Sequence, residues 1–212
     1  MTTDQKLAAS IGERQSIRRY LPEPLERPVI ERLLAAAMRA PSTHNRQPWR
    51  FAVLDDDASK RRLAEAMGER LRTDRTADGD DVKAIDADVS RSYARITGAP
   101  VVVVVCVDIR NMDHYPDDRR NGAEYLMAVQ STAMAAQNLL LAAQSEGLGA
   151  CVMCAPLFCP DTVTDALELP REWTAQMLVT IGAPGRPGKE RPRLPLGDIV
   201  SWPPHRRTPS SG

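Results

Sequence analysis

The longest uninterrupted apolar stretch of the chain, APVVVVVCV from Ala99 to Val107, constrains the fold more than any other feature. It has the length and composition of a strand, and it is far shorter than the roughly 20 apolar residues that a membrane span needs. A strand that is apolar at every position is buried on both faces. The stretch therefore predicts a central strand in a sheet that helices cover on both sides.

The remaining pattern alternates helices with strands and contains no internal repeat. Strands are predicted at 49–54, 149–154 and 174–182, and helices at 4–13, 28–39, 58–71, 118–146 and 160–167. The middle of helix 118–146 is small and apolar almost all round, which predicts a buried helix, either in the core or at a subunit interface. We expect one α/β or α+β sandwich domain over residues 1–200 and a flexible tail over 201–212.

Residues 73–95 are rich in Asp and Arg and poor in large apolar side chains. This composition predicts a mobile loop followed by an exposed helix. The segment is either a solvated face or a lid over a site. Arg75, Arg91 and Arg95 would suit an anionic substrate, or they are surface charges.

The charge balance gives no support for a nucleic-acid partner, because 28 Lys and Arg offset 28 Asp and Glu. The N-terminus MTTDQKLAASIGE carries acids and no long apolar region, so we expect no signal peptide and a cytoplasmic protein without membrane association. Cys151 and Cys154 form a CxxC without a second ligand pair, so we expect packing cysteines and no metal site, rather than zinc or thiol redox chemistry.

Two basic motifs lie near opposite ends of the chain. In RQSIRR, the side chains of Arg14, Ser16 and Arg18 alternate, so an extended backbone would point them to one side. Two guanidinium forks flanking a hydroxyl suit a phosphate, although a solvated basic turn has the same composition. Arg191 and Arg193 in RPRLP alternate in the same way and can join the first pair only if the fold brings them together.

The turn APSTHNRQPW between a helix and a strand is crowded with polar side chains. Ser42, Thr43 and Asn45 offer donors and acceptors that would suit the edge of a flat heterocycle such as an isoalloxazine, or they simply end the helix. The chain has no GxSxG, HExxH, P-loop or Rossmann motif. An enzyme without such groups often leaves its chemistry to a cofactor.

Four motifs together resemble those of the nitroreductase-like flavoproteins. RQSIRRY, APSTHNRQPW, GLGAC and IGAPGRPGKERPRLP occur in the order found in that family, and the resemblance covers residues 12–200. It implies an α+β sandwich with a central, mostly antiparallel sheet flanked by helices. It also implies an intertwined homodimer with FMN at the interface, a small-molecule substrate, and NAD(P)H or a reduced partner as electron donor.

The same resemblance assigns roles to residues. Those implied to hold the FMN phosphate and ribityl chain are Arg14, Gln15, Ser16, Arg18, Arg191 and Arg193. Those implied to reach the flavin of the other subunit are Pro41, Ser42, Thr43 and Asn45. The segment from Val152 to Ala155, with Met153, Cys154 and Ala155 as its cofactor-binding residues, would pass the reactive edge of the flavin with a backbone N–H near N5. No side chain is implied as catalytic, because the chemistry takes place at N5.

A narrower resemblance concerns the FMN domain of FbiB, a two-domain actinobacterial ligase of coenzyme F-420 biosynthesis. It rests on HYPD at 114–117, AEYLM at 123–127, LFC at 157–159 and LELPREW at 167–173. It implies a reductase for a dehydro precursor of the coenzyme, standing alone because the chain has no counterpart of the ligase domain. The alternatives are a generalist NAD(P)H-dependent nitro or quinone reductase, a flavin-fragmenting dimethylbenzimidazole synthase, and a non-catalytic flavin-binding module.

Overall fold

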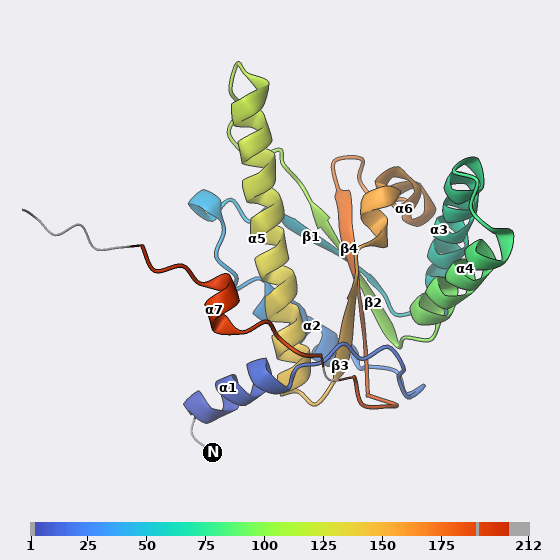
Figure 1. Cartoon of the computed structure of the whole chain (residues 1–212), viewed down its shortest axis with the longest axis horizontal. Coiled ribbons are helices and arrows are strands. Elements are labelled where there is room, and N and C mark those ends of the chain that lie inside the picture. Colours follow the sequence, from blue (N-terminus) through green and yellow to red (C-terminus); the bar gives the residue numbers. More distant parts are fainter. Residues whose placement is uncertain (1–2, 190, 204–212) are drawn as a thin grey trace, which may run out of the picture.

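The structure, a computed structural model, describes residues 3–189 and 191–203 and is built on one four-stranded sheet. The strands are β1 (Trp49–Leu54), β2 (Val101–Val107), β3 (Gly149–Met153) and β4 (Thr174–Gly182), in the order β1-β2-β4-β3 (Figure 1). Every neighbouring pair is antiparallel. The four predicted strands and the antiparallel sheet are therefore confirmed.

Strand β2 is buried on both faces, as the valine run predicts. All seven of its residues are at most 1% exposed. Val102, Val104 and Cys106 pack in one core cluster with Leu63 and Met67. The alternate residues pack in a second cluster on the other face, with Leu33 and Leu139; they are Val101, Val103 and Val105. The period of two residues divides the hydrophobic core between the two faces.

Helices cover both faces of the sheet, which makes the fold an α+β sandwich. One layer contains α2 (Arg27–Ala37) and α5 (Asp118–Ser145), and α1 (Thr3–Glu13) contacts α5. The other contains α3 (Asp57–Ala77), α4 (Val82–Thr97) and α6 (Pro160–Leu167). Short helical turns occur at η1 (Thr43–Asn45), η2 (Ala155–Phe158) and α7 (Leu196–Ile199), which the sequence pattern does not predict.

Helix α5 is only partly buried, although its composition predicts a buried helix. By length and composition it could cross a membrane, contrary to the expectation that no segment is long and apolar enough. Of its most apolar window, 44% is buried inside the protein, as in the core helix of a globular domain. Its N-terminal half projects beyond the sheet (Figure 1) and exposes Tyr125 and Leu126, and Met134 is exposed further along the helix.

The prediction of a mobile loop within residues 73–95 is wrong. Helix α3 continues to Ala77, and α4 begins at Val82, so the segment belongs to a helical hairpin. Asp81 caps α4 by accepting a hydrogen bond from the N–H of Ala84 at 2.9 Å. Charged pairs such as Arg70 with Asp74 lie one turn apart, at 2.8 Å. Such pairs and caps stabilise a helix that has few large apolar residues.

The cysteines divide into packing residues and one exposed thiol. Cys106, Cys151 and Cys159 are buried, and burial raises the pKa of the Cys106 thiol to about 12. Cys154 is exposed because it lies just beyond β3, at the start of η2, so its assignment as a packing residue is wrong. Most of the predicted flexible tail, residues 204–212, lies outside the described residues.

Candidate functional site

The fold brings the two basic motifs together. A cavity of ≈ 320 Å³, called the Ser16 cavity below, is lined by residues of both segments. Six of them are the predicted phosphate-binding and ribityl-binding residues Arg14, Gln15, Ser16, Arg18, Arg191 and Arg193. Gly12 and Lys189 complete the lining, and sequence reasoning did not select them. Lys189 continues the alternation of Arg191 and Arg193, and this signal could have identified it.

Close backbone contact positions the first motif beside β3. Ser16 forms a parallel bridge with Ala150, and the N–H of Ile17 donates to the carbonyl of Ala150 at 3.0 Å. A Cβ on Gly149 would lie 2.6 Å from the Cβ of Ile17, so only glycine permits this approach. The segment therefore runs along the edge strand as a short extension of the sheet.

The second motif crosses the first at Gly188. A Cβ there would lie 2.6 Å from both Cβ and Oε1 of Gln15. The absence of a side chain at Gly188 thus lets the segment with Lys189, Arg191 and Arg193 approach the segment with Arg14. Glycine at this position is a condition for assembling the cavity.

Tyr20 anchors the far end of the segment that carries the first motif, residues 14–20, which is called the connector below. Its hydroxyl donates to the carbonyl of Ile17 at 2.6 Å and lies 2.7 Å from Oγ1 of Thr180 on β4. Burial raises the pKa of Tyr20, so the phenol stays neutral at physiological pH. The connector is therefore fixed to the sheet at both Ile17 and Tyr20.

The Ser16 cavity has a strong excess of positive charge. None of its arginines, nor Lys189, forms an ion pair with any other described residue, and no described Asp or Glu lines it. Within the described part of the chain, Arg18 and Arg193 each donate only to a backbone carbonyl, at 3.4 Å. Guanidinium groups without carboxylate partners, beside the Ser16 hydroxyl, form a donor set that fits a phosphate.

Strand β3 leads from this cavity to the predicted reactive edge. Cys154 follows Ala150 by four residues, which corresponds to roughly 13 Å along an extended backbone. Cys154 is exposed, whereas Met153 and Ala155 are half-buried. An elongated ligand with its phosphate at Ser16 could therefore reach all three residues along the edge strand.

The polar turn after α2 is separate from the Ser16 cavity within one chain. Asn45 lines a different cavity of ≈ 550 Å³ with Met38 and Gln47, and the two cavities share no residue. The structure of one chain thus does not bring Pro41, Ser42, Thr43 and Asn45 to the other predicted residues.

Hydrogen bonds and an unusual backbone shape this turn. Oγ of Ser42 accepts from the N–H of Gln47 at 3.0 Å, and the N–H of Thr43 donates to Oγ of Ser131 at 3.4 Å. His44, Asn45 and Gln47 have φ values of 47°, 54° and 49°. Left-handed conformations of residues other than glycine are uncommon and concentrate at functional sites.

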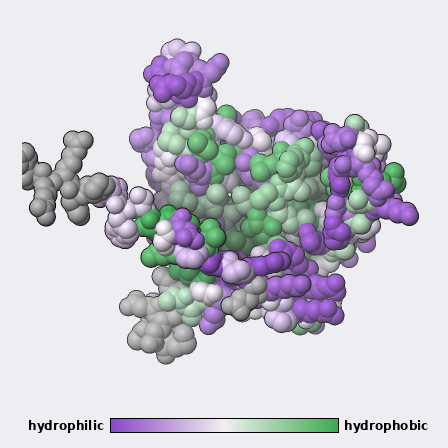
Figure 2. Space-filling view, in the orientation of Figure 1, coloured by the Kyte–Doolittle hydropathy of each residue, from purple (hydrophilic) through white to green (hydrophobic). Residues whose placement is uncertain are grey.

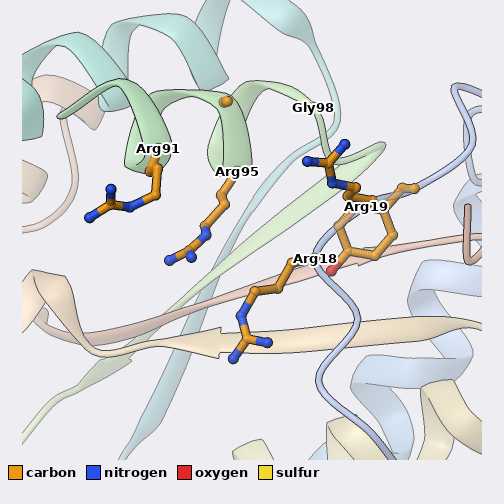
Figure 3. Close-up of a pocket in the computed structure, with 7 residues that line it drawn as sticks. Arg18, Arg19, Arg91, Arg95 and Gly98 are labelled. Atoms are coloured by element: carbon orange, nitrogen blue, oxygen red, sulfur yellow. The ribbon is translucent and has the colours of Figure 1, made fainter. Parts of the chain in front are cut away.

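A second basic cavity lies on the opposite side of Arg18. It has a volume of ≈ 590 Å³ and is called the Arg95 cavity below. Arg18 and Arg19 reach it from the connector, and Arg91 and Arg95 from α4 (Figure 3). Arg75, which the sequence pattern groups with the last two, instead pairs with Asp80 and Asp88. Among residues 3–189 and 191–203, no cluster of His, Cys, Asp and Glu could hold a metal.

Comparisons with known proteins agree on one family. Residues 11–183 match the model of the Nitroreductase family. A protein of Thermus thermophilus named NADH dehydrogenase is 30% identical, over 94% of this chain and 96% of its own length. The 5,6-dimethylbenzimidazole synthase of Rhodospirillum rubrum is 29% identical, over 92% of this chain and 88% of its own.

A solved structure extends this similarity to the fold. A protein of Desulfovibrio desulfuricans, crystallised in complex with FMN, superposes with a TM-score of 0.73 at 26% identity. The match covers 94% of this chain and 97% of that one.

Proposed function

The chain belongs to the nitroreductase family, and from that premise we propose that it is an FMN-dependent oxidoreductase that uses NAD(P)H. The observation that carries this proposal is the Ser16 cavity, where two distant basic motifs converge without a carboxylate partner among the described residues. Bound FMN would supply the hydride chemistry for which the chain has no recognisable motif of its own. The name of the Thermus relative supports a nicotinamide reductant.

The chain's own residues would then bind the FMN and orient it. Arg14, Arg18, Arg191 and Arg193 would neutralise the FMN phosphate, and the Ser16 hydroxyl would donate to it. The hydrogen bond from Ile17 to Ala150 holds the connector beside β3 and so positions Arg14, Ser16 and Arg18. Met153, Cys154 and Ala155 would orient the edge of the ring through their backbone, so the exposed Cys154 thiol has no assigned redox role.

A second copy of the chain completes the proposed site. Large apolar side chains are exposed on α5 and on the segment around α7, and they include Tyr125, Leu126, Met134, Leu196, Ile199 and Trp202. Figure 2 shows hydrophobic side chains gathered over α7 on the visible face. Exposed apolar surface of this kind marks interfaces. In such a homodimer, the polar turn with Ser42, Thr43 and Asn45 would meet the partner's flavin.

The proposed acceptor is a dehydro precursor of coenzyme F-420. The support is the set of motifs at 114–117, 123–127, 157–159 and 167–173, which resemble those of the FMN domain of the F-420 ligase. A generalist nitro or quinone reductase is the second candidate, favoured by the broad name of the Thermus relative. Parallel assays with the precursor and with simple quinones decide between them, because a generalist would show no preference for the precursor.

The first test measures the visible flavin absorbance of purified protein, before and after addition of NADPH without oxygen. Bleaching of the band is expected. Arg14→Ala combined with Arg193→Ala should give folded protein without flavin, because two charge-assisted phosphate contacts of about 1.5–3 kcal/mol each are lost. Arg61→Ala, on the exposed side of α3 and without an ion pair among the described residues, is the control and should stay yellow. A yellow double variant would show that the phosphate lies elsewhere.

A further inference from the structure

The Arg95 cavity is lined by more positive charge than the described carboxylates around it neutralise. Four arginines line it, and no described Asp or Glu does. Only Arg91 has an ionic partner, Asp88, while Arg18, Arg19 and Arg95 pair with no described carboxylate. The chain as a whole is neutral, so this concentration is local. Like charges held together lower stability unless an anion joins them.

The cavity is continuous with the Ser16 cavity but not identical to it. A third cavity of ≈ 550 Å³ lies between them. It shares Ser16, Arg18, Lys189 and Arg191 with the Ser16 cavity, and Arg18, Arg19 and Arg95 with the Arg95 cavity. Arg91, Arg95 and Arg19 do not line the Ser16 cavity. A phosphate bound within the Ser16 cavity would therefore not fill the Arg95 cavity, where Arg19 and Arg95 have no described carboxylate partner.

Helix α4 also borders the predicted reactive edge. Ser92 lines a small apolar cavity of ≈ 80 Å³ together with Ala155 and Phe158 of η2. Arg91 and Arg95 project from α4 (Figure 3), and Ser92 of the same helix lines the small cavity beside Ala155. A molecule bound beside Ala155 could extend along α4 and place an anionic group among these arginines.

We propose that the Arg95 cavity binds a phosphate group of the small molecule that exchanges hydride at this site, separately from the phosphate of FMN. This inference rests on the proposed function. A volume of ≈ 590 Å³ suits part of a small ligand. Several planar guanidinium groups can each donate a pair of hydrogen bonds to phosphate oxygens. A single carboxylate would need fewer such donors than this cavity offers. The phosphate belongs either to the reductant NADPH or to a phosphorylated acceptor.

The test is calorimetric titration of the FMN-saturated protein with inorganic pyrophosphate, so that the Ser16 cavity is already filled. The native protein should bind, and Arg95→Ala should weaken binding at least about tenfold, because a charge-assisted contact is lost. Arg95→Lys, which keeps the charge and loses the fork, should fall between them. Arg61→Ala should bind like the native protein, and all variants should retain FMN and melt no lower than the native protein.

Two results would overturn the inference: absence of pyrophosphate binding by the native holoprotein, or equal binding by Arg95→Ala. Kinetics then identify the source of the phosphate. If Arg95→Ala raises KM for NADPH but not for NADH, the reductant carries it. If both KM values stay unchanged while pyrophosphate binding is lost, the acceptor does. The titration needs no turnover, so a protein that NADPH fails to bleach would contradict the proposed function without deciding this inference.

Discussion

Arginines serve opposite purposes at two places in this protein. At the end of β2, Nη2 of Arg50 and Nη2 of Arg110 lie 3.1 Å and 2.7 Å from Oδ2 of Asp108, which is almost completely buried. In the Ser16 cavity, arginines converge from two chain segments and meet no described carboxylate. The ion pairs of Asp108 hold the end of β2 to the loop that follows it. The arginines of the Ser16 cavity have no such described partner and so leave a place for an anion. Pairing, rather than the number of arginines, separates structural from functional charge.

The largest effect on stability is expected for Asp108→Asn. The substitution keeps the shape but leaves Arg50 and Arg110 without their anion, at a cost of about 3 kcal/mol in the free energy of unfolding. Urea denaturation measures this cost. Asp165→Ala removes the exposed partner of Arg171 and is the control, with an expected cost below about 0.5 kcal/mol. Similar losses in both variants would break the contrast between buried and exposed pairs.

The contribution of Asp108 should depend on pH. The hydrogen bonds from Arg110 hold the pKa of this carboxyl below its usual value in the folded protein. A lowered pKa stabilises the fold at every pH above the unfolded value of about 3.9, and this stabilisation disappears as the pH falls through the folded value. The difference in unfolding free energy between the native protein and Asp108→Asn should therefore be constant near neutrality and shrink below about pH 4. A difference that grew toward acid would contradict the assignment.

A smaller loss is expected for Gly149→Ala, which tests how the Ser16 cavity is held. The new Cβ would lie 2.6 Å from the Cβ of Ile17 and push the connector from β3, at a cost of about 2 kcal/mol. Flavin retention should fall together with stability. Gly122→Ala in α5 is the matched control, because a Cβ at this position would meet no atom of another part of the protein within 4 Å. It should raise the free energy of unfolding by about 1 kcal/mol. Normal flavin content in Gly149→Ala would show that the connector does not position the phosphate.

The smallest effect on stability is expected for Arg193→Ala in protein stripped of flavin. Arg193 is exposed and has no carboxylate partner among the described residues, so the free energy of unfolding should change by less than about 0.5 kcal/mol. Thermal unfolding at low and high salt measures this, since relief of repulsion would raise the melting temperature slightly at low salt. A loss comparable to that of Asp108→Asn would mean that Arg193 serves the fold.

Local patterns predicted most elements of this fold. The valine run, the alternation in the other strands and the long apolar helix carry their own periodicity, and β1 to β4 and α5 follow it within a few residues. Among the failures are residues 73–77, where α3 continues, Cys154, where β3 has already ended, and α5, which is only partly buried. Pairs such as Arg70 with Asp74 support the hairpin without large apolar residues, and hydrophobic periodicity does not detect such support.

The sequence by itself determined the buried central strand, the sandwich of helices around it and the basic character of both motifs, because these depend on local period and side-chain chemistry. Only the tertiary structure decided which charges meet. Arg18 lines both the Ser16 cavity and the Arg95 cavity. The connector that carries Arg18 pairs with β3, and α4 supplies the residues of the Arg95 cavity that face it. Contacts between residues so far apart in the sequence depend on how the sheet and the helices pack. They also depend on Gly149 and Gly188, which let their segments approach Ile17 and Gln15 closely.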